Sequence, residues 1–341
     1  MIMITGKYNS AAVYTDNLES SAEEQIRVLC DQPFAAGSNI AIMPDVHAGK
    51  GCTIGTTMTV GEFVVPCLVG VDIGCGMLTV RLKEKSINLP ELDSLIRQNI
   101  PFGRDVRNRP HRSHGRINLE TLRCYRKINP RRVKESLGTL GGGNHFIEVD
   151  RDDEENLYLV IHTGSRNPGL RVAEFYQKKA YDSIGGRKQS EIPYELSPLS
   201  GDDKDDYLAD MRFMQQFAAL NRCIIKEEIL SGMNLHEEEE FTTVHNYIDT
   251  NEMILRKGAV SAREGERLLI PLNMRDGSLL CTGLGNKSTN YSAPHGAGRK
   301  YSRKTRKTIL LSLNLKHQWE AFSQPQYPEK HWTNVLWRTR I

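Results

Sequence analysis

The chain has 341 residues, a formal net charge of +3, and 39% hydrophobic residues. These values are ordinary for a globular protein and exclude a highly charged disordered chain; net charge alone does not identify a nucleic-acid-binding protein. Seven cysteines, an odd number without a CxxC pair, argue against a disulfide framework or a zinc ribbon. Because no apolar run approaches the roughly 20 residues of a membrane helix and no signal segment is recognisable, we expect a soluble, cytoplasmic protein without membrane association.

Helical and extended patterns follow one another irregularly along the chain. Apolar residues at helical spacing predict helices over 17–30, 90–99, 168–184 and 204–231. Short β-branched runs between Gly, Pro and Asp turns predict a block of strands within 40–82, including 63–69, and further strands at 145–150, 157–162, 242–248, 267–272 and 278–281. Because helices and strands do not alternate regularly, we predict an α+β fold of mixed sheets with flanking helices.

Residues 102–132 form an arginine-rich segment that also contains His111 and His114. The segment lacks apolar periodicity, so we expect an exposed basic loop. Two interpretations remain open for it: a loop that faces RNA phosphates, or a solvated arginine-rich surface without a ligand.

The sequence GVDIGCGM places Asp72 and Cys75 in a glycine-rich turn after an apolar run. A carboxylate and a thiolate three residues apart can both reach a cation, and a thiolate can bridge two cations. The alternative is a turn whose Asp caps backbone amides and whose Cys packs as a small hydrophobe, and this motif alone favours the alternative.

Three histidines lie beside predicted strands. His145 follows a triple glycine, whose backbone amides could approach a phosphate, while His162 ends an apolar strand and His245 lies in the sequence VHNYI. One such histidine would more often be structural, but three of them together with a Cys and an Asp predict a metal site. Mixed oxygen, nitrogen and sulfur donors favour zinc, iron or manganese and do not choose among these metals. Arg166, near a helix start, is suited to a phosphate.

The sequence SAPHGAGR places His295 in a tight turn, where we expect its imidazole to be exposed. With Arg299 nearby, such a histidine can attack phosphorus and hold the product as a phosphoramidate. A turn histidine bonded to its own backbone is the alternative. Asp45 and His47, in the sequence PDVH, have roles that the sequence does not separate from turn formation.

Taken in order, the motifs MPDVHAGKGCTIG, GVDIGCGM, GGGNHFIEV, HTGSRNPG, VHNYI, NMRDGS and SAPHGAGR resemble the RtcB family of GTP-dependent RNA ligases. The resemblance implies an RtcB-like fold and a site that holds two Mn²⁺ ions and GTP. It further implies that Cys75 bridges the two ions, that Asp72 and His145 hold one of them, and that His162 and His245 hold the other.

The resemblance also implies that His295 attacks the α-phosphate of GTP and becomes guanylylated. Arg166 and Arg299 would then face RNA phosphate. The implied reaction joins an RNA end with a 2′,3′-cyclic phosphate or 3′-phosphate to a 5′-hydroxyl end, in tRNA splicing or in repair of cleaved tRNA or rRNA, with an archease-like activator as a candidate partner. The residues that would bind the guanylate are Asn144, Phe146, Glu148, Asn246, Asn273, Ser278, Gly296, Ala297 and Gly298.

The resemblance ends near residue 304, and composition changes with it. Residues 299–341 carry ten Lys or Arg against two Glu, and they hold all three tryptophans. We therefore predict a catalytic domain over 1–305 and a divergent or frame-shifted tail over 306–341. A frame shift is the favoured interpretation, and a divergent tail that contacts single-stranded RNA is the alternative. Either would affect guanine binding more than metal binding.

Two other functions could use the same residues. A metal-dependent RNA cyclic phosphodiesterase would need the metal site but no covalent nucleotide carrier. An inactive RNA-binding remnant would need neither, and the divergent tail makes this reading worth testing. The histidine in SAPHGAGR and the segment NMRDGS favour the ligase.

Overall fold

The computed structural model describes residues 1–186, 192–273 and 277–298. Its helices are α1 Ser20–Cys30, α2 Pro66–Val69, α3 Leu89–Asn99, α4 Pro130–Ser136, α5 Arg166–Ser183 and α6 Gly201–Met233. Its strands are β1 Ile2–Thr5, β2 Ser10–Val13, β3 Ile40–His47, β4 Ile54–Thr59, β5 Gly76–Leu82, β6 Phe146–Arg151, β7 Leu157–Thr163, β8 Glu237–Val244, β9 Asn246–Asp249, β10 Ile254–Lys257, β11 Ala259–Ser261, β12 Arg267–Asn273, β13 Gly277–Thr282 and β14 Ser292–Pro294.

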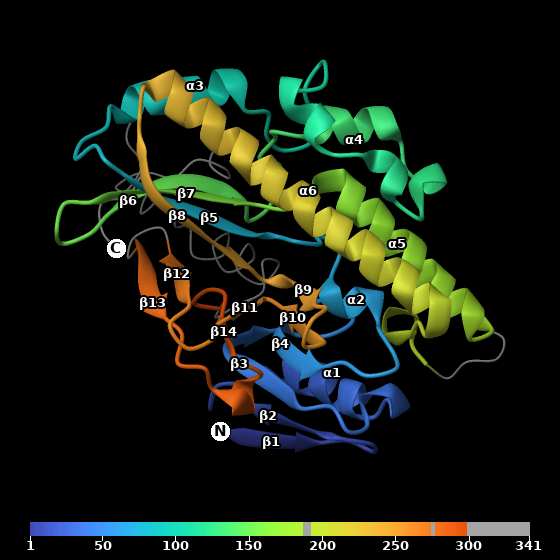
Figure 1. Ribbon diagram of the computed structural model, residues 1–341. Helices are drawn as coiled ribbons and strands as arrows, with labels where there is room; N and C mark the ends of the chain where they lie inside the picture. The colour runs from blue at the N-terminus through green and yellow to red at the C-terminus, as the bar shows by residue number, and fades with distance from the viewer. Residues whose placement is uncertain (187–191, 274–276, 299–341) are drawn as a thin grey trace, which may run out of the picture.

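Two main sheets organise the molecule. One has the strand order β6-β7-β5-β8, and the other has the order β1-β2-β3-β4-β10-β9. Figure 1 shows the four-stranded sheet in the middle, with α3, α4 and α6 on one side and the six-stranded sheet on the other. Two ribbons, β11-β14 and β12-β13, complete the described strands. This arrangement confirms the predicted α+β fold.

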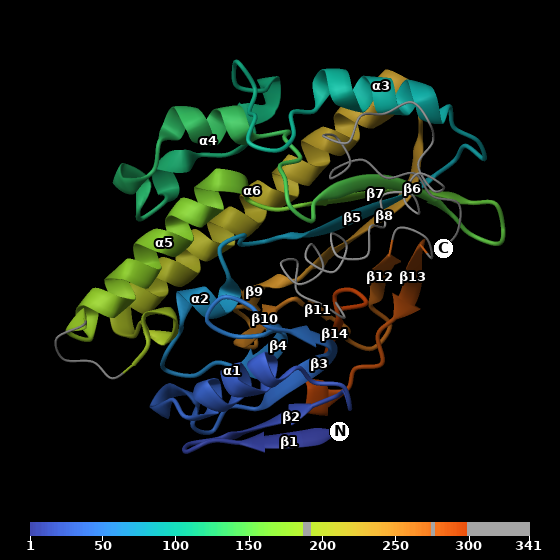
Figure 2. The ribbon, with the colours of Figure 1, turned by 180° about the vertical axis from the view of Figure 1, so that it is seen from behind.

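Helix α6 is the longest element and lies across the four-stranded sheet, with α5 running beside it (Figure 2). Acidic residues occupy its first turn, and it ends at Asn234, whose left-handed backbone caps the last turn through a bond to Leu230 O. Ile225 and Ile229 of α6 belong to the same buried cluster as residues of β5, β6 and β7. Burial of this apolar face therefore fixes α6 against the sheet.

The opposite face of the four-stranded sheet is covered by β12. Met77 and Val160 pack there with Leu269 of β12. Side chains alternate between the faces of a sheet, so Cys75 and His162, two residues along from Met77 and Val160, lie on this same side. The sheet thus separates the candidate ligands from most of the α6 apolar face.

Two predicted strands differ from the structure. Residues 63–69 do not form a strand, because Pro66 begins the short helix α2, whose four residues are all buried. The predicted strand 242–248 is divided into β8 and β9 at His245. The prediction of a strand at 63–69 is therefore wrong. The prediction of one strand at 242–248 misses the break at His245, which is a candidate ligand.

The arginine-rich segment 102–132 is not an exposed loop throughout. It contains three short 3-10 helices, and Leu119, Leu122, Cys124 and Ile128 join the largest buried cluster. The buried carboxylate of Asp210 in α6 accepts bonds from the backbone N–H groups of Arg123 and Cys124. These 3-10 helices have only three to five residues each, so they are too short to give a repeating apolar pattern in the sequence.

The predicted helices correspond to α1, α3, α5 and α6, each within a few residues. Elements that the sequence did not indicate are α4 and the short strands β1, β2, β10, β11 and β14. Within the described ranges, no helix has both the length and the apolar character needed to cross a membrane. The predicted tail 306–341 lies outside the described residues.

Candidate active site and metal centre

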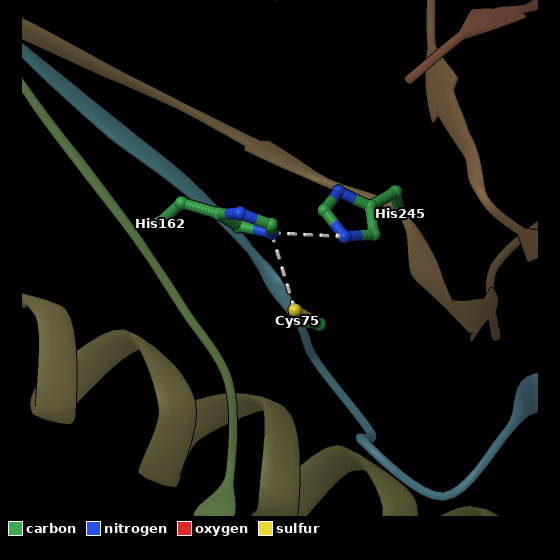
Figure 3. A group of neighbouring side chains, drawn as sticks. All are labelled: Cys75, His162 and His245. Atoms are coloured by element: carbon green, nitrogen blue, oxygen red, sulfur yellow. Dashed lines mark hydrogen bonds between the residues drawn. The ribbon is translucent and has the colours of Figure 1, made fainter. Parts of the chain in front are cut away.

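The structure brings the five predicted metal ligands together at one end of the four-stranded sheet. They form two groups of potential ligands that share Cys75. Asp72, Cys75 and His145 make up one group, and Cys75, His162 and His245 make up the other, with the ligand atoms of each group within 4.8 Å of one another. Figure 3 shows the second group, in which the sulfur and the two imidazoles point toward a common centre.

The side-chain nitrogen, oxygen and sulfur atoms of the five residues lie close to one another. Cys75 Sγ lies 3.4 Å from Nε2 of both His145 and His162. His162 Nε2 lies 3.4 Å from His245 Nε2, and His145 Nε2 lies 2.9 Å from Asp72 Oδ2. The cysteine and the three histidines are all buried. A single sulfur thus stands between two sets of nitrogen and oxygen donors.

Backbone pairing explains why Cys75 and His245 meet. Gly76 of β5 pairs with Val244 of β8, and the ladder continues where His245 N–H donates to Cys75 O at 2.9 Å. Gly74 N–H then donates to Asn246 O at 2.8 Å. The break between β8 and β9 therefore lies beside the Cys75 turn and holds both ligands at the same level.

Hydrogen bonds at Nδ1 fix the orientation of two imidazoles. His162 Nδ1 donates to Asn144 O at 2.9 Å, and His145 Nδ1 donates to Leu140 O at 3.0 Å. These bonds leave the Nε2 lone pairs directed at the Cys75 sulfur. Arg166 Nη1 is also 3.0 Å from His145 Nδ1, but two donors do not pair, so the guanidinium lies beside the cluster as a cation.

These residues fit a pair of divalent cations. His162 Nε2 and His245 Nε2 face each other at 3.4 Å, and His245 Nδ1 is buried without a hydrogen-bond partner among the described residues, so a cation bound at both Nε2 atoms could replace the proton that would otherwise lie between them. Asp72 Oδ1 is a buried acceptor without a hydrogen-bond donor among the described residues. A shared thiolate with carboxylate and imidazole donors suits manganese, iron or zinc.

Burial determines the protonation of the cluster without a cation. It lowers the pKa of His162 and His245 well below the usual value, and it raises the pKa of the Cys75 thiol well above the usual value, with the Asp72 charge acting in the same direction. Burial also acts to raise the pKa of Asp72, but its contact with His145 and the charge of the Arg166 guanidinium lower it. His162 and His245 are therefore neutral and ready to bind a cation, whereas Cys75 must first lose a proton.

Two glycines allow the close approach of charged side chains. A Cβ on Gly164 would lie 2.3 Å from Asp72 Oδ1, and a Cβ on Gly141 would lie 1.6 Å from Arg166 Nη2. Arg166 itself has a left-handed backbone, with φ of 59°, at the start of α5. The triple glycine, interpreted from sequence as a possible phosphate loop, thus also makes room for the Arg166 guanidinium.

His295 lies beside the metal cluster, immediately after β14. Its ring centroid is 5.0 Å from that of His245. Its Nδ1 donates to Asp45 Oδ2 at 2.6 Å, and the side chains of His295 and Asp45 are 19% and 2% exposed. The expected exposed imidazole is therefore largely covered. Asp45, whose role the sequence left open, holds the Nδ1 proton, so that the Nε2 lone pair of His295 is available as a nucleophile.

Some of the predicted nucleotide-binding residues are buried or half-buried near the candidate metal ligands, and others are exposed. Ser278 Oγ donates to Glu148 Oε1 at 3.4 Å, both side chains being buried, and the Phe146 ring lies edge-on to His162 with centroids 5.0 Å apart. Asn246 Nδ2 donates to Asp72 O at 3.2 Å and so supports the metal turn. The others are the exposed Asn144 and Asn273, and Gly296, Ala297 and Gly298, which follow His295. Arg299 and residues 274–276 of NMRDGS lie outside the described residues.

Two buried polar residues behind the cluster were not identified from the sequence. Asn221 and Arg222 are 0% and 2% exposed, and both bond to backbone groups of the ligand-bearing segments. The signal that could have found them is a polar pair in the apolar stretch FAALNRCII, in the middle of a long helix.

Comparisons with known proteins identify the family of the chain. The family model described as tRNA-splicing ligase RtcB matches residues 25–121 and 102–323. The chain is 32% identical to the RNA-splicing ligase RtcB of Escherichia coli K12, over 86% of this chain and 81% of that protein. It is also 28% identical to the tRNA-splicing ligase RtcB of Aeropyrum pernix, over 86% and 80%, and 26% identical to that of Nanoarchaeum equitans, over 78% and 74%. The chain belongs to the RtcB family of RNA-splicing ligases.

Proposed function

We propose that this protein joins a 2′,3′-cyclic phosphate or 3′-phosphate RNA end to a 5′-hydroxyl RNA end, with GTP, two Mn²⁺ ions and His295 as a covalent nucleotide carrier. The observation that carries the proposal is the position of an oriented histidine against a shared-thiolate metal site. His295 is bonded to Asp45 on one side, and its ring lies 5.0 Å from that of His245 on the other. A hydrolase that used the metal site alone would not need this histidine.

The two groups around Cys75 would each hold one Mn²⁺ ion. Asp72, Cys75 and His145 would hold one ion, and Cys75, His162 and His245 would hold the other. When bound, the ions supply positive charge that neutralises phosphate oxygens and polarises water. Because the Nδ1 atoms of His145 and His162 donate to carbonyls, both rings keep the orientation that binding requires.

His295 would act as the nucleophile on GTP. Its Nε2 lone pair attacks the α-phosphorus, an N–P bond forms, and the P–O bond to pyrophosphate breaks, so pyrophosphate leaves with the electron pair. The imidazole becomes positively charged during this attack. The buried Asp45 carboxylate, at 2.6 Å from Nδ1, stabilises that charge and keeps the ring from rotating.

The guanylate would then pass to RNA. An oxygen of the RNA 3′-phosphate attacks the phosphorus held by His295, breaking the N–P bond and forming a phosphoanhydride. The 5′-hydroxyl oxygen next attacks the RNA phosphorus and expels GMP, which leaves a phosphodiester; a cyclic phosphate must first be opened by water. Arg166 and Arg299 are proposed to bind RNA phosphate. The residues proposed to bind the guanylate are Asn144, Phe146, Glu148, Asn246, Asn273, Ser278, Gly296, Ala297 and Gly298.

Covalent labelling by α-labelled GTP in the presence of Mn²⁺ tests the nucleotide carrier. We expect His295→Ala to abolish labelling and to leave metal binding intact. His236→Ala is a matched control, since His236 is exposed and pairs with Glu84 away from the site. Labelling that persists in the His295 variant would sink the assignment.

The same assay separates the alternative functions. Covalent labelling indicates ligase chemistry, and loss of a cyclic phosphate without labelling indicates a phosphodiesterase. If neither labelling nor loss of the cyclic phosphate occurs, the protein is an RNA-binding remnant. Cleaved tRNA and rRNA are the proposed substrates in the cytoplasm. An archease-like protein is a candidate activator, and we expect it, if it acts here, to raise the rate of guanylylation.

A further inference from the structure

Arg222 is a buried cation on α6, directly behind the candidate metal ligands. Its Nη1 donates to Gly74 O at 2.9 Å and to Thr163 O at 2.8 Å. Gly74 precedes the ligand Cys75, and Thr163 follows the ligand His162. One guanidinium nitrogen therefore ties the two ligand-bearing backbones to α6 and to each other.

The preceding residue, Asn221, holds the third ligand-bearing segment. Its Oδ1 accepts bonds from Gly138 N–H at 2.7 Å and Thr139 N–H at 3.1 Å, and its Nδ2 donates to Thr139 O at 3.0 Å. Leu140 is the next residue, and its carbonyl accepts the bond from His145 Nδ1. Asn221 thus sets the start of the loop that orients His145.

Stability alone gives a poor reason for Arg222. A guanidinium that is 2% exposed loses most of its hydration, and no carboxylate forms an ion pair with it among the residues that the structure describes. Replacing a buried charged group by apolar residues of similar volume is often neutral or stabilising, although here Gly74 O and Thr163 O would lose a donor. The charge faces Cys75 and Asp72, whose negative forms are the ones that bind cations.

We propose that Asn221 and Arg222 are positioning residues for the metal centre, and that they hold the three ligand-bearing segments at the separation that lets Cys75 serve both cation groups. The proposal rests on the proposed metal centre and is independent of nucleotide transfer. Loss of Arg222 frees the Cys75 turn to move relative to His162, so the shared sulfur is the ligand affected first.

The test uses the full chain with Co²⁺ alone, because a cobalt–thiolate bond gives a charge-transfer absorption that reports on Cys75. We expect Arg222→Met to lower Co²⁺ affinity on the order of 10- to 100-fold, the usual effect of removing a group that orients metal ligands. The thiolate absorption should weaken in parallel. Arg222→Lys, which retains a charged donor, should recover part of both.

Lys226→Met is the matched control, one helical turn further along α6. The Lys226 side chain is 12% exposed and pairs with Glu237 and Glu240, away from the ligand segments. We expect wild-type Co²⁺ affinity and absorption for this variant. A merely structural role for Arg222 predicts a lower unfolding temperature of the metal-free protein with unchanged Co²⁺ affinity and absorption, and that result would overturn the proposal.

Asn221→Ala provides an independent test if Arg222→Met does not fold. It should weaken Co²⁺ binding through His145, and wild-type affinity in this variant would overturn the proposal. Because GTP and RNA are absent, the outcome is separable from the ligase reaction. If the wild-type protein binds Co²⁺ but is not labelled by GTP, the proposed ligase reaction is contradicted and the positioning role of Asn221 and Arg222 is not. If the wild-type protein binds no Co²⁺, the positioning role is contradicted.

Discussion

The contact between His295 and Asp45 decides which nitrogen of the imidazole can react. Asp45 accepts the Nδ1 proton at 2.6 Å, and its carboxylate is almost fully buried. Gly298 packs over Asp45, where a Cβ would approach the Asp45 backbone to 3.0 Å. The chain that follows the histidine therefore lies close against the Asp45 backbone.

We expect Asp45→Asn to slow covalent labelling by GTP on the order of 100-fold or more. The asparagine amide can donate to Nδ1, which moves the imidazole proton to Nε2 and removes the reactive lone pair. Single-turnover labelling measures the rate, and Mn²⁺ affinity should stay at the wild-type value. An unchanged labelling rate would show that Asp45 does not orient His295.

At the scale of elements, β14 is held by a second buried arginine. Arg256 of β10 is fully buried and donates to Ser292 Oγ at 2.8 Å, to Tyr247 Oη at 2.9 Å and to Asn290 O at 3.1 Å. Asn290 and its neighbour Tyr291 both have left-handed backbones. Arg256 therefore stabilises an unfavourable turn that leads into β14, the strand that ends directly before His295.

We expect Arg256→Met to lower the free energy of unfolding by about 2–4 kcal/mol, because buried carbonyl and hydroxyl groups lose their donor. Labelling of His295 should slow as well, since β14, which directly precedes it, loses the Arg256 hydrogen bonds. Urea unfolding and single-turnover labelling measure the two effects. Arg171→Met, which removes only an exposed ion pair with Glu174, should change neither, and a stable Arg256→Met protein with normal labelling would contradict this account.

The sequence predicts some of these elements better than others. The helices follow from apolar periodicity, which is a local property, and α6 was located within a few residues. Helix α2 was missed because β-branched residues around Pro66 mimic a strand. Strands such as β11 and β14 have three residues each and form only because Ala259 meets Pro294, which lies far along the chain.

In the candidate site, too, the sequence predicts local features better than contacts between distant segments. Each ligand could be suspected from its motif, and the family resemblance grouped them. The shared position of Cys75 between His145 and His162 depends on how β5, β6 and β7 pair, which the motifs do not contain. The stretch FAALNRCII could have marked Arg222 as unusual, but the role of Arg222 could not be inferred from the sequence, because its partners are backbone carbonyls, which carry no residue-specific pattern.

For the molecule as a whole, the site joins the two main sheets. The candidate metal ligands belong to the four-stranded sheet and its connections, whereas Asp45 belongs to β3 of the six-stranded sheet. His245 lies between β8 of one sheet and β9 of the other. A movement of one sheet against the other would shift Asp45, and His295 with it, relative to the candidate metal ligands, so the packing between the sheets is part of the candidate site.

The protonation of the buried ligands makes the stability of the metal-free protein depend on pH. The folded-state pKa values of His162 and His245 lie below the ordinary 6.5, so below about pH 6.5 the unfolded chain binds more protons and stability falls. The pKa of Cys75 lies above the ordinary 9.0, so above about pH 9 the unfolded chain loses a proton that the folded chain keeps, and stability falls again. We expect the thermal unfolding temperature to be highest between these limits, and a maximum outside them would contradict the protonation states assigned here.

Between pH 6.5 and 9 the same states fix how cation binding depends on pH. His162 and His245 are neutral and Asp72 is ionised, so of these three residues and Cys75 only the Cys75 thiol has a proton to lose. Mn²⁺ affinity should therefore rise about tenfold per pH unit, with one proton released per centre, as calorimetry in buffers of different ionisation enthalpy can measure. Cys30→Ser is the matched control, because burial raises the pKa of that thiol to about 11 at a place remote from the site. Its proton release should equal that of the wild-type protein, and a pH-independent affinity would show that Cys75 is not a ligand.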